Sequence, residues 1–263
     1  MTGVIEIKKL LRERVTEILK LEERVPQKRE EMVSGDTSPF FMELFGAEMA
    51  LLVKVGQSLQ ATFGMAFYEQ ACQTLGETAG YAVETQKKVY GSISPAVSSY
   101  LKNTLGDMAY RPNRQQELEE VRRLSDPGAA VEHPDSTVDV YIKTPTGAEL
   151  LIDITTVKPN KKEFRILKEK LLRWAAMRFS QDPQATVEPY IAIPYNPESL
   201  AVDGIVYSRH SAYYDRRDIL VGDELWKKVS NQTFSIRDMV DVFAQLHKEL
   251  KKDIEDAVTD IQG

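Results

Sequence analysis

Two aspartates in the middle of the chain are the residues whose types and spacing could do chemistry. Asp139 and Asp153 lie in PDSTVDVYIKTPTGAELLIDITTVKPNKKE, residues 134–163, a pattern that predicts two short strands joined by a turn. Each strand carries one carboxylate. Two carboxylates held together repel each other unless a cation neutralises them, and hard oxygen ligands suit Mg²⁺ or Mn²⁺. The pair therefore predicts a divalent-metal site, and the lysine-rich segment after it suits a phosphate backbone.

The register of the two strands decides whether the aspartates meet. Alternation along each strand separates Asp139 and Asp153 from the β-branched residues beside them. The segment TPTG, residues 144–147, supplies the turn residues. If the turn is centred between Pro145 and Thr146, Asp139 lies almost opposite Asp153. A slip of one residue would separate them. The alternative interpretation is a common half-buried hairpin whose aspartates face solvent.

A basic helix is predicted directly after the second strand. Asn160, with Glu163 three residues later, forms a capping-box pattern, and apolar residues recur at helical spacing through EFRILKEKLLRWAAMRF. Residues 158–178 hold eight basic and two acidic side chains in a chain whose formal net charge is −6. Three residues at the start of the helix are candidate contacts to a nucleic-acid backbone: Lys161, Lys162 and Arg165. A solvated helix face is the alternative.

A second basic segment, IVYSRHSAYYDRR at residues 205–217, interleaves aromatic and basic side chains. Such a mixture suits contacts to phosphates and bases. The candidate DNA-binding residues of this segment are Arg209, His210, Arg216 and Arg217. A loop with scattered polar residues explains the pattern equally well.

The hairpin and the basic helix together resemble the core of the PD-(D/E)xK nuclease superfamily. More narrowly, DITTVKPNKKEF followed by LKEKLLRWAAMR resembles the TdeIII and MjaII group of type II restriction endonucleases. Three further blocks, FGMAFYEQ (63–70), IAIPYNP (191–197) and DILVGDELWKKV (218–229), are similar to blocks of these enzymes in the same order. The resemblance extends over roughly residues 35–250, and its strength lies in the ordered set.

The resemblance implies a Mg²⁺-dependent enzyme that hydrolyses both strands of double-stranded DNA at a specific short palindrome, as a homodimer. Asp139 and Asp153 would be metal ligands, and Glu69 would complete or orient the metal shell. A water activated by the metal would attack the phosphorus in line. Asp135, in the literal Pro-Asp pair, precedes the strand and ranks below Asp139.

The sequence departs from the family pattern at Thr155, where a lysine is expected two residues after the second acid to orient water and offset charge. Lys158 is the nearest replacement, although alternation points it to the other face unless the strand bulges or ends first. Lys143 and Lys161 are further candidates, or Thr155 itself holds the water. The departure leaves two alternatives open: a DNA-binding protein on an impaired nuclease fold, and a structure-specific repair nuclease.

Composition and periodicity predict the fold class. The 263 residues are 42% hydrophobic and 28% charged, as in soluble globular proteins, and contain no apolar run of membrane-spanning length. We expect an α/β restriction-endonuclease-like core, a mixed central sheet flanked by helices. Residues 1–125 are predicted to be mainly helical, and residues 126–263 to form the core with a C-terminal helix. The single cysteine, Cys72, excludes a disulfide framework and favours the cytoplasm.

Overall fold

The computed structural model describes residues 2–35, 39–64, 66–107, 109–155, 158–198, 207–208, 212 and 214–262. The elements before the central hairpin are α1 (Thr2–Leu19), α2 (Leu21–Val33), α3 (Pro39–Gly64), α4 (Ala66–Thr78), β1 (Ala82–Lys88), α5 (Pro95–Gly106) and α6 (Arg114–Leu124). From the hairpin onward they are β2 (Thr137–Lys143), β3 (Glu149–Ile154), α7 (Lys161–Gln181), β4 (Val187–Ile193), η2 (Arg216–Asp218), β5 (Ile219–Val221), α8 (Asp223–Val229) and α9 (Ile236–Gln262). The chain divides into two compact units, Met1–Tyr68 with Arg237–Gly263, and Glu69–Ile236.

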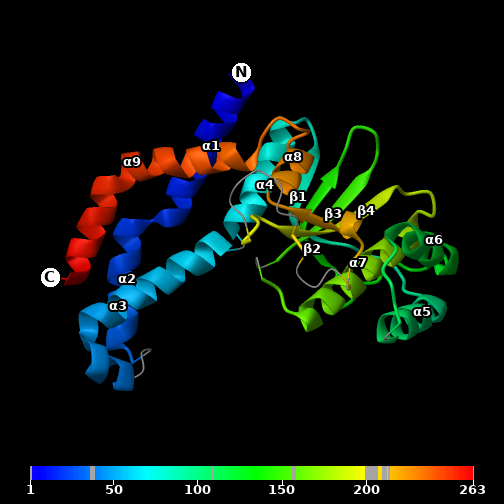
Figure 1. Ribbon diagram of the computed structural model, residues 1–263, viewed down its shortest axis with the longest axis horizontal. Helices are drawn as coiled ribbons and strands as arrows, with labels where there is room; N and C mark the ends of the chain where they lie inside the picture. Colours follow the sequence, from blue (N-terminus) through cyan, green and yellow to red (C-terminus); the bar gives the residue numbers. More distant parts are fainter. Residues whose placement is uncertain are drawn as a thin grey trace. The chain divides into compact units, whose positions relative to one another are not determined.

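A five-stranded mixed sheet forms the centre of the unit Glu69–Ile236 (Figure 1). The strands lie in the order β1-β2-β3-β4-β5. β1, β2 and β3 pair antiparallel, whereas β3, β4 and β5 pair parallel. The parallel step from β3 to β4 needs a crossover, and α7 provides it. β3 is therefore the strand at which the antiparallel hairpin meets the parallel half of the sheet.

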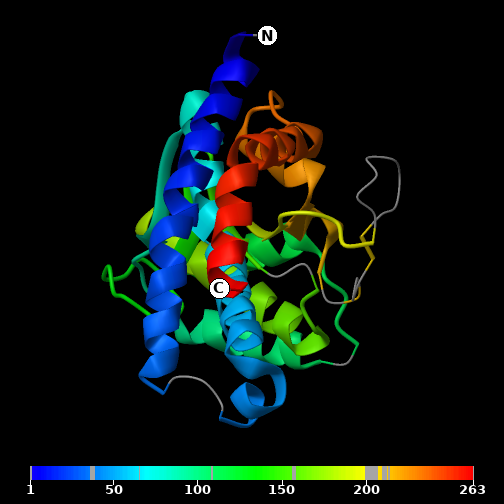
Figure 2. The same ribbon diagram turned by 90° about the vertical axis from the view of Figure 1, so that its left-hand side faces the viewer.

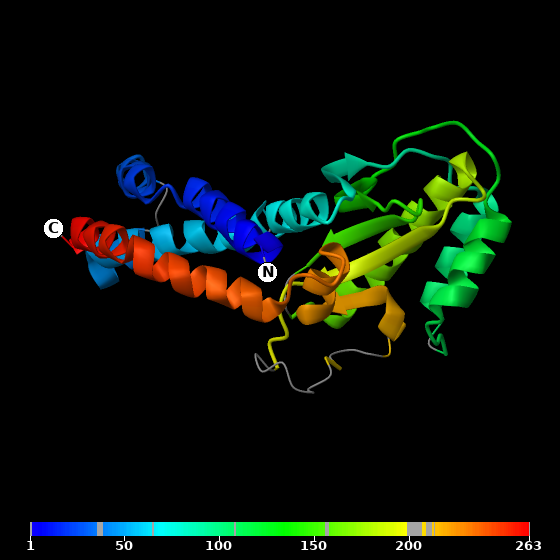
Figure 3. The same cartoon turned by 90° about the horizontal axis from the view of Figure 1, so that it is seen from above.

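Helices cover both faces of this sheet, which explains why every residue of β3 is buried (Figure 3). α7 packs against β3 and β4, and α5 and α6 pack in turn on α7. On the opposite face, a Cβ at Gly76 of α4 would approach Val83 of β1 and Ile142 of β2. α4 therefore lies close against the hairpin. Strands buried on both faces leave an acidic side chain little access to water. The carboxylates of the two aspartates are therefore poorly solvated.

The start of α7 is fixed by the capping box that the sequence predicts. The Asn160 side chain accepts hydrogen bonds from the Lys162 and Glu163 amides, and the Glu163 carboxylate accepts from the Asn160 amide. These contacts satisfy helix-start donors that have no partner within the helix. The cap fixes where α7 begins and therefore which of its side chains reach the sheet.

Helices α1, α2, α3 and α9 make up the other unit, and α1 runs beside α9 (Figure 2). The Lys8 ammonium lies 2.9 Å from an Asp238 carboxylate oxygen, and Arg12 lies 3.9 Å from Glu249. α3 bends at Gly46, whose φ of 81° is outside the helical region. Within the part of the chain that the structure describes, no helix is long and apolar enough to cross a membrane.

The predicted fold class is confirmed, a mixed sheet flanked by helices and preceded by a helical region. The predicted division at residue 125 stays a prediction, and two elements bear on it. β1 lies within the stretch expected to be helical, because a polar edge strand carries little apolar periodicity. α9 groups with the N-terminal helices rather than with the sheet, because its amphipathic face packs there.

Candidate active site

The hairpin brings Asp139 and Asp153 together. β2 and β3 pair with Val140 opposite Ile152, so one further step along the strands places the two aspartates opposite each other on one face. The Ile154 amide donates a hydrogen bond of 2.7 Å to Asp139 Oδ2, which ties the first carboxylate to the end of β3. The turn that sets this register has its left-handed residue at Gly147, φ 87°.

Both carboxylates are buried, which rules out the solvent-facing alternative. Asp139 is 9% exposed and Asp153 is 3% exposed. Burial raises the pKa of Asp139, and it raises the pKa of Asp153 to about 6. The charge of Asp139 raises the Asp153 pKa further, while Lys170 lowers it. Two buried acids that repel each other form the kind of electronegative site that attracts a cation.

Lys170 of α7 supplies the positive charge at this pair. The Lys170 ammonium donates a 2.5 Å hydrogen bond to Asp153 Oδ1. Farther along α7, the Arg178 guanidinium donates to both carboxylate oxygens of Glu149, at 2.6 and 2.8 Å. These two ion pairs hold α7 antiparallel to β3, with Lys170 over the acidic pair.

The spacing of these four residues shows why both pairs form at once. Lys170 and Arg178 are separated by eight residues on α7, a rise of about 12 Å. Asp153 and Glu149 are separated by four residues on β3, a rise of about 13 Å. Sequence reasoning missed Lys170, but this match between helical and strand spacing is a signal that could have found it.

Glu69 reaches the acidic pair through Gln86, a second residue that sequence reasoning missed. The Gln86 side-chain amide donates to Glu69 Oε1 at 2.8 Å and to Asp139 Oδ1 at 3.4 Å. Gln86 has φ 51° within β1, and the β1–β2 pairing skips this residue. Such a backbone persists only where the surrounding structure requires it, and here it accompanies the Gln86 contacts to Glu69 and Asp139. Burial raises the pKa of Glu69 as well.

Among the described residues, no ion pair joins Lys143 or Lys158 to either aspartate. The Thr155 amide donates to the Ala192 carbonyl at 2.9 Å, so the backbone still follows the sheet there. Lys158 is exposed, and among the described residues its ammonium has no ion pair with either aspartate. Lys143 lies four residues from Asp139, about 13 Å along β2. The assignment of a role to Lys158 stays a prediction.

The predicted DNA-binding residues fall into three groups. Lys161, Lys162 and Arg165 are exposed on the first turns of α7. Arg216 forms an ion pair with Glu224, and Arg217 donates to Asp215 at 2.7 Å, so both guanidinium groups are engaged within the protein. Arg209 and His210 lie outside the described residues.

The donor set at the aspartates fits Mg²⁺. Mg²⁺ is usually held by one or two carboxylates, with waters and substrate phosphate oxygens completing its shell. Asp139 and Asp153 offer two buried carboxylates whose mutual repulsion a cation would relieve. Within the described ranges, no cluster of three or more His, Cys, Asp or Glu side chains could enclose an ion.

Comparisons with known proteins show what the chain is similar to. A family model described as "Type II restriction endonuclease, HinfI" matches residues 4–247. The type II restriction enzyme MjaII of Methanocaldococcus jannaschii is 24% identical over 72% of this chain. The matched part spans about half of MjaII, 53% of its length. HgiCII and HgiEI, type II restriction enzymes of Herpetosiphon aurantiacus, are 24% and 25% identical over 76% and 74% of this chain, and over 74% and 72% of their own lengths. The predicted resemblance to type II restriction endonucleases is confirmed.

Proposed function

Because the chain belongs to the HinfI family of type II restriction endonucleases, we propose that it cleaves both strands of double-stranded DNA at a specific short palindrome in a Mg²⁺-dependent reaction. The observation that carries the proposal is the buried pair of Asp139 and Asp153 with Lys170 against it. The proposal includes a cytoplasmic location, where such an enzyme would meet DNA.

Each residue of the site has a separate part in the proposed reaction. Asp139 and Asp153 would hold Mg²⁺, and the bound ion would supply positive charge for water activation and for the scissile phosphate. Asp139 keeps its orientation through the hydrogen bond from the Ile154 amide. Gln86 orients Asp139 and links it to Glu69, which completes the surroundings of the ion. These contacts fix the carboxylates before substrate arrives, so little reorganisation remains during the reaction.

Lys170 takes the part that the family pattern gives to a lysine at the position of Thr155. Its ammonium lies beside Asp153, where it stabilises the negative charge that develops on the phosphate as the bond breaks. In this proposal the positive charge comes from Lys170 on α7 instead of from a lysine at position 155 of the chain. The charge is thus retained at the site although it comes from a different part of the sequence. Lys158 remains the alternative, and a comparison of the two lysines is described in the Discussion.

Cleavage of both strands calls for two acidic pairs, and each chain provides one. A two-fold homodimer places one pair at each strand of a palindrome, because the symmetry of the site then matches the symmetry of the protein. The homodimer is part of the proposal.

Digestion of a large unmethylated phage DNA tests the proposal. The purified protein is incubated with Mg²⁺ or with EDTA, beside Asp153→Asn and a control, Asp126→Asn, whose side chain is exposed. We expect discrete fragments with Mg²⁺ alone, retained by the control and lost in Asp153→Asn. Cleavage without fixed fragments would indicate a structure-specific repair nuclease. Intact DNA in every lane, with binding that survives EDTA, would indicate a DNA-binding protein on a nuclease fold.

A further inference from the structure

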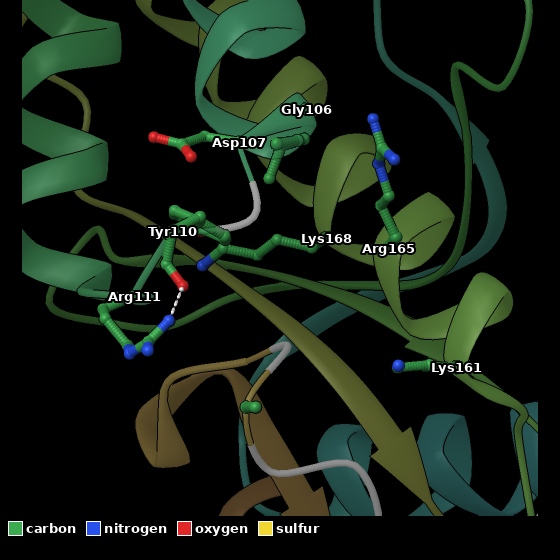
Figure 4. A pocket seen from close by; sticks show the side chains of 9 residues that line it. Gly106, Asp107, Tyr110, Arg111, Lys161, Arg165 and Lys168 are labelled. Carbon is green, nitrogen blue, oxygen red and sulfur yellow. Dashed lines mark hydrogen bonds between the residues drawn. The ribbon is translucent and has the colours of Figure 1, made fainter.

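A cavity lies between the end of α5 and the first half of α7, within the unit Glu69–Ile236 (Figure 4). Its volume is about 370 Å³, in the range of small-molecule sites. The residues that line it are Leu105, Gly106, Asp107, Tyr110, Arg111, Lys161, Arg165, Lys168 and Ala212. We call it the α5–α7 cavity. The metal-binding aspartates are not part of it, whereas Lys161 and Arg165 are also candidate DNA contacts, so a DNA ligand in this cavity rests on the proposed function.

Among the described residues, the α5–α7 cavity is lined by two guanidinium groups that have no ion pair and by one carboxylate. The Arg165 guanidinium has no hydrogen bond or ion pair among the described residues, and it is exposed at the rim. The Arg111 guanidinium donates only to backbone carbonyls, those of Ala109 and Tyr110. The one lining carboxylate, Asp107, accepts from the Ala109 amide of its own loop at 2.8 Å. Two guanidinium groups therefore remain available to an anion.

The charged side chains of the inner wall neutralise one another, so this wall adds no net positive charge to the cavity. The Lys168 ammonium is 1% exposed, lies 2.5 Å from Asp218, and also forms an ion pair with Glu117. Arg114 completes the group at 3.3 Å from Asp218, giving two cations and two carboxylates. Burial with such pairing holds this wall rigid. Beside it, Leu105 is buried and Tyr110 is half-buried, and they offer an apolar surface below the charged rim.

The α5–α7 cavity and the acidic pair lie on different sides of α7. Successive residues of an α-helix are separated by about 100°, so Lys170 lies about 140° from Arg165 around the axis. Lys168 and Lys170 are separated by about 160° by the same reasoning. A ligand in the cavity therefore would not lie over Asp139 and Asp153, and the cavity is a separate site.

We propose that the α5–α7 cavity binds a nucleotide unit by its phosphate, with Arg165 on the phosphate oxygens and the nucleoside against Leu105 and Tyr110. Arg111 lies on the opposite side of the cavity and adds positive charge there (Figure 4). Guanidinium groups bind phosphate oxygens in pairs of parallel hydrogen bonds, which gives both charge and geometry. A cavity of about 370 Å³ exceeds what a bare phosphate fills. The phosphate belongs either to a free nucleotide or to the DNA backbone beyond the cleaved site, and the two sources are distinguished by experiment.

Two measurements test the cavity in the full-length protein with EDTA present, so that neither depends on cleavage. Calorimetric titration uses each of the four 5′-deoxynucleoside monophosphates, the matching deoxynucleosides and inorganic phosphate. Gel-shift titration of a duplex at several salt concentrations gives the salt dependence of DNA binding. Both compare the wild type with Arg165→Gln and with Lys102→Gln, which removes an exposed positive charge of α5 outside the cavity.

The expected result takes one of two forms. If the ligand is free nucleotide, monophosphates bind the wild type, nucleosides do not, and Arg165→Gln weakens binding at least tenfold while Lys102→Gln does not. If the ligand is the DNA backbone, Arg165→Gln lowers the slope of log affinity against log salt by about 0.9, the loss of one phosphate contact. The proposal is overturned if Arg165→Gln matches Lys102→Gln in both measurements. Loss of cleavage without change in either measurement would bear on the acidic pair alone.

Discussion

Lys170 is the residue on which the chemistry of the site depends most directly. Its ammonium is 2.5 Å from Asp153, whereas Lys158 is exposed and has no ion pair with either aspartate among the described residues. We expect Lys170→Met to lower kcat about 100-fold, as the loss of one preorganised electrostatic contact does. Lys158→Met, the matched control, should stay within about threefold of wild type. Single-turnover cleavage at saturating Mg²⁺ compares the rates of the two variants. If Lys158→Met were the slower variant, Lys158 would be the lysine that stabilises the developing charge.

The pKa of Asp153 predicts how acidity affects Mg²⁺ binding. Burial raises this pKa from an ordinary value of 3.8 to about 6, so the proton must leave before the carboxylate can bind a cation. Apparent Mg²⁺ affinity should therefore fall about tenfold per pH unit below pH 6 and be nearly constant above pH 7. Titration of Mg²⁺ by calorimetry between pH 5 and pH 8 measures this. A flat profile over that range would contradict it.

The same pKa has a consequence for stability in the absence of metal. The folded-state pKa of Asp153 is higher than the unfolded-state value, so its protonated form favours the fold. This contribution is fully present below about pH 4 and is lost as pH rises through about 6. Metal-free Asp153→Asn should thus lose less stability than the wild type over that window, and thermal unfolding in EDTA measures the difference.

At the scale of elements, the site depends on how closely α7 packs on its neighbours. A Cβ at Gly91, in the segment after β1, would lie 2.1 Å from the Met177 carbonyl of α7, so backbone would have to move. We expect Gly91→Ala to lower the free energy of unfolding by about 3 kcal/mol, as overpacking against backbone does. Gly56→Ala in α3 is the control, because nothing lies within 4 Å of its Cβ. That change should be neutral or stabilise by up to about 1 kcal/mol. Urea unfolding measures the free energy of unfolding of both variants. Equal changes in the two variants would contradict the close packing inferred at Gly91.

The parts of the site that the sequence predicts are those determined by local pattern. Alternation and turn residues predict that Asp139 meets Asp153, and the capping box at Asn160 predicts the start of α7. Lys170 could not be found this way, because its contact depends on how a helix lies across a sheet. Gln86 could not be found either, because β1 is a polar edge strand in a region with helical periodicity on both sides. Both residues reach the site through contacts between elements that are distant in the sequence, and local sequence patterns do not predict such contacts.

At the scale of the whole molecule, α3 carries large apolar side chains that are exposed among the described residues, here called the α3 apolar stripe. The large exposed apolar residues of α3 are Phe40, Leu44, Phe45, Met49, Leu52 and Val53. They lie before and after the bend at Gly46. Such a surface is typical of an interface between proteins, and cleavage of both strands calls for a second copy of the chain. We expect a dimer of twice the 29.8 kDa chain mass, held in part by this stripe.

Light scattering coupled to size exclusion tests the dimer, with the double variant Leu44→Glu and Met49→Glu. Both side chains are exposed, so the charges should leave the fold of one chain intact while adding repulsion between two. We expect the variant to be monomeric and to nick or spare DNA that the wild type cuts through. Val240→Glu, a single exposed change on α9, should remain dimeric. A wild type of 29.8 kDa that still cuts both strands would sink the dimer, because one acidic pair would then act on the two strands in turn.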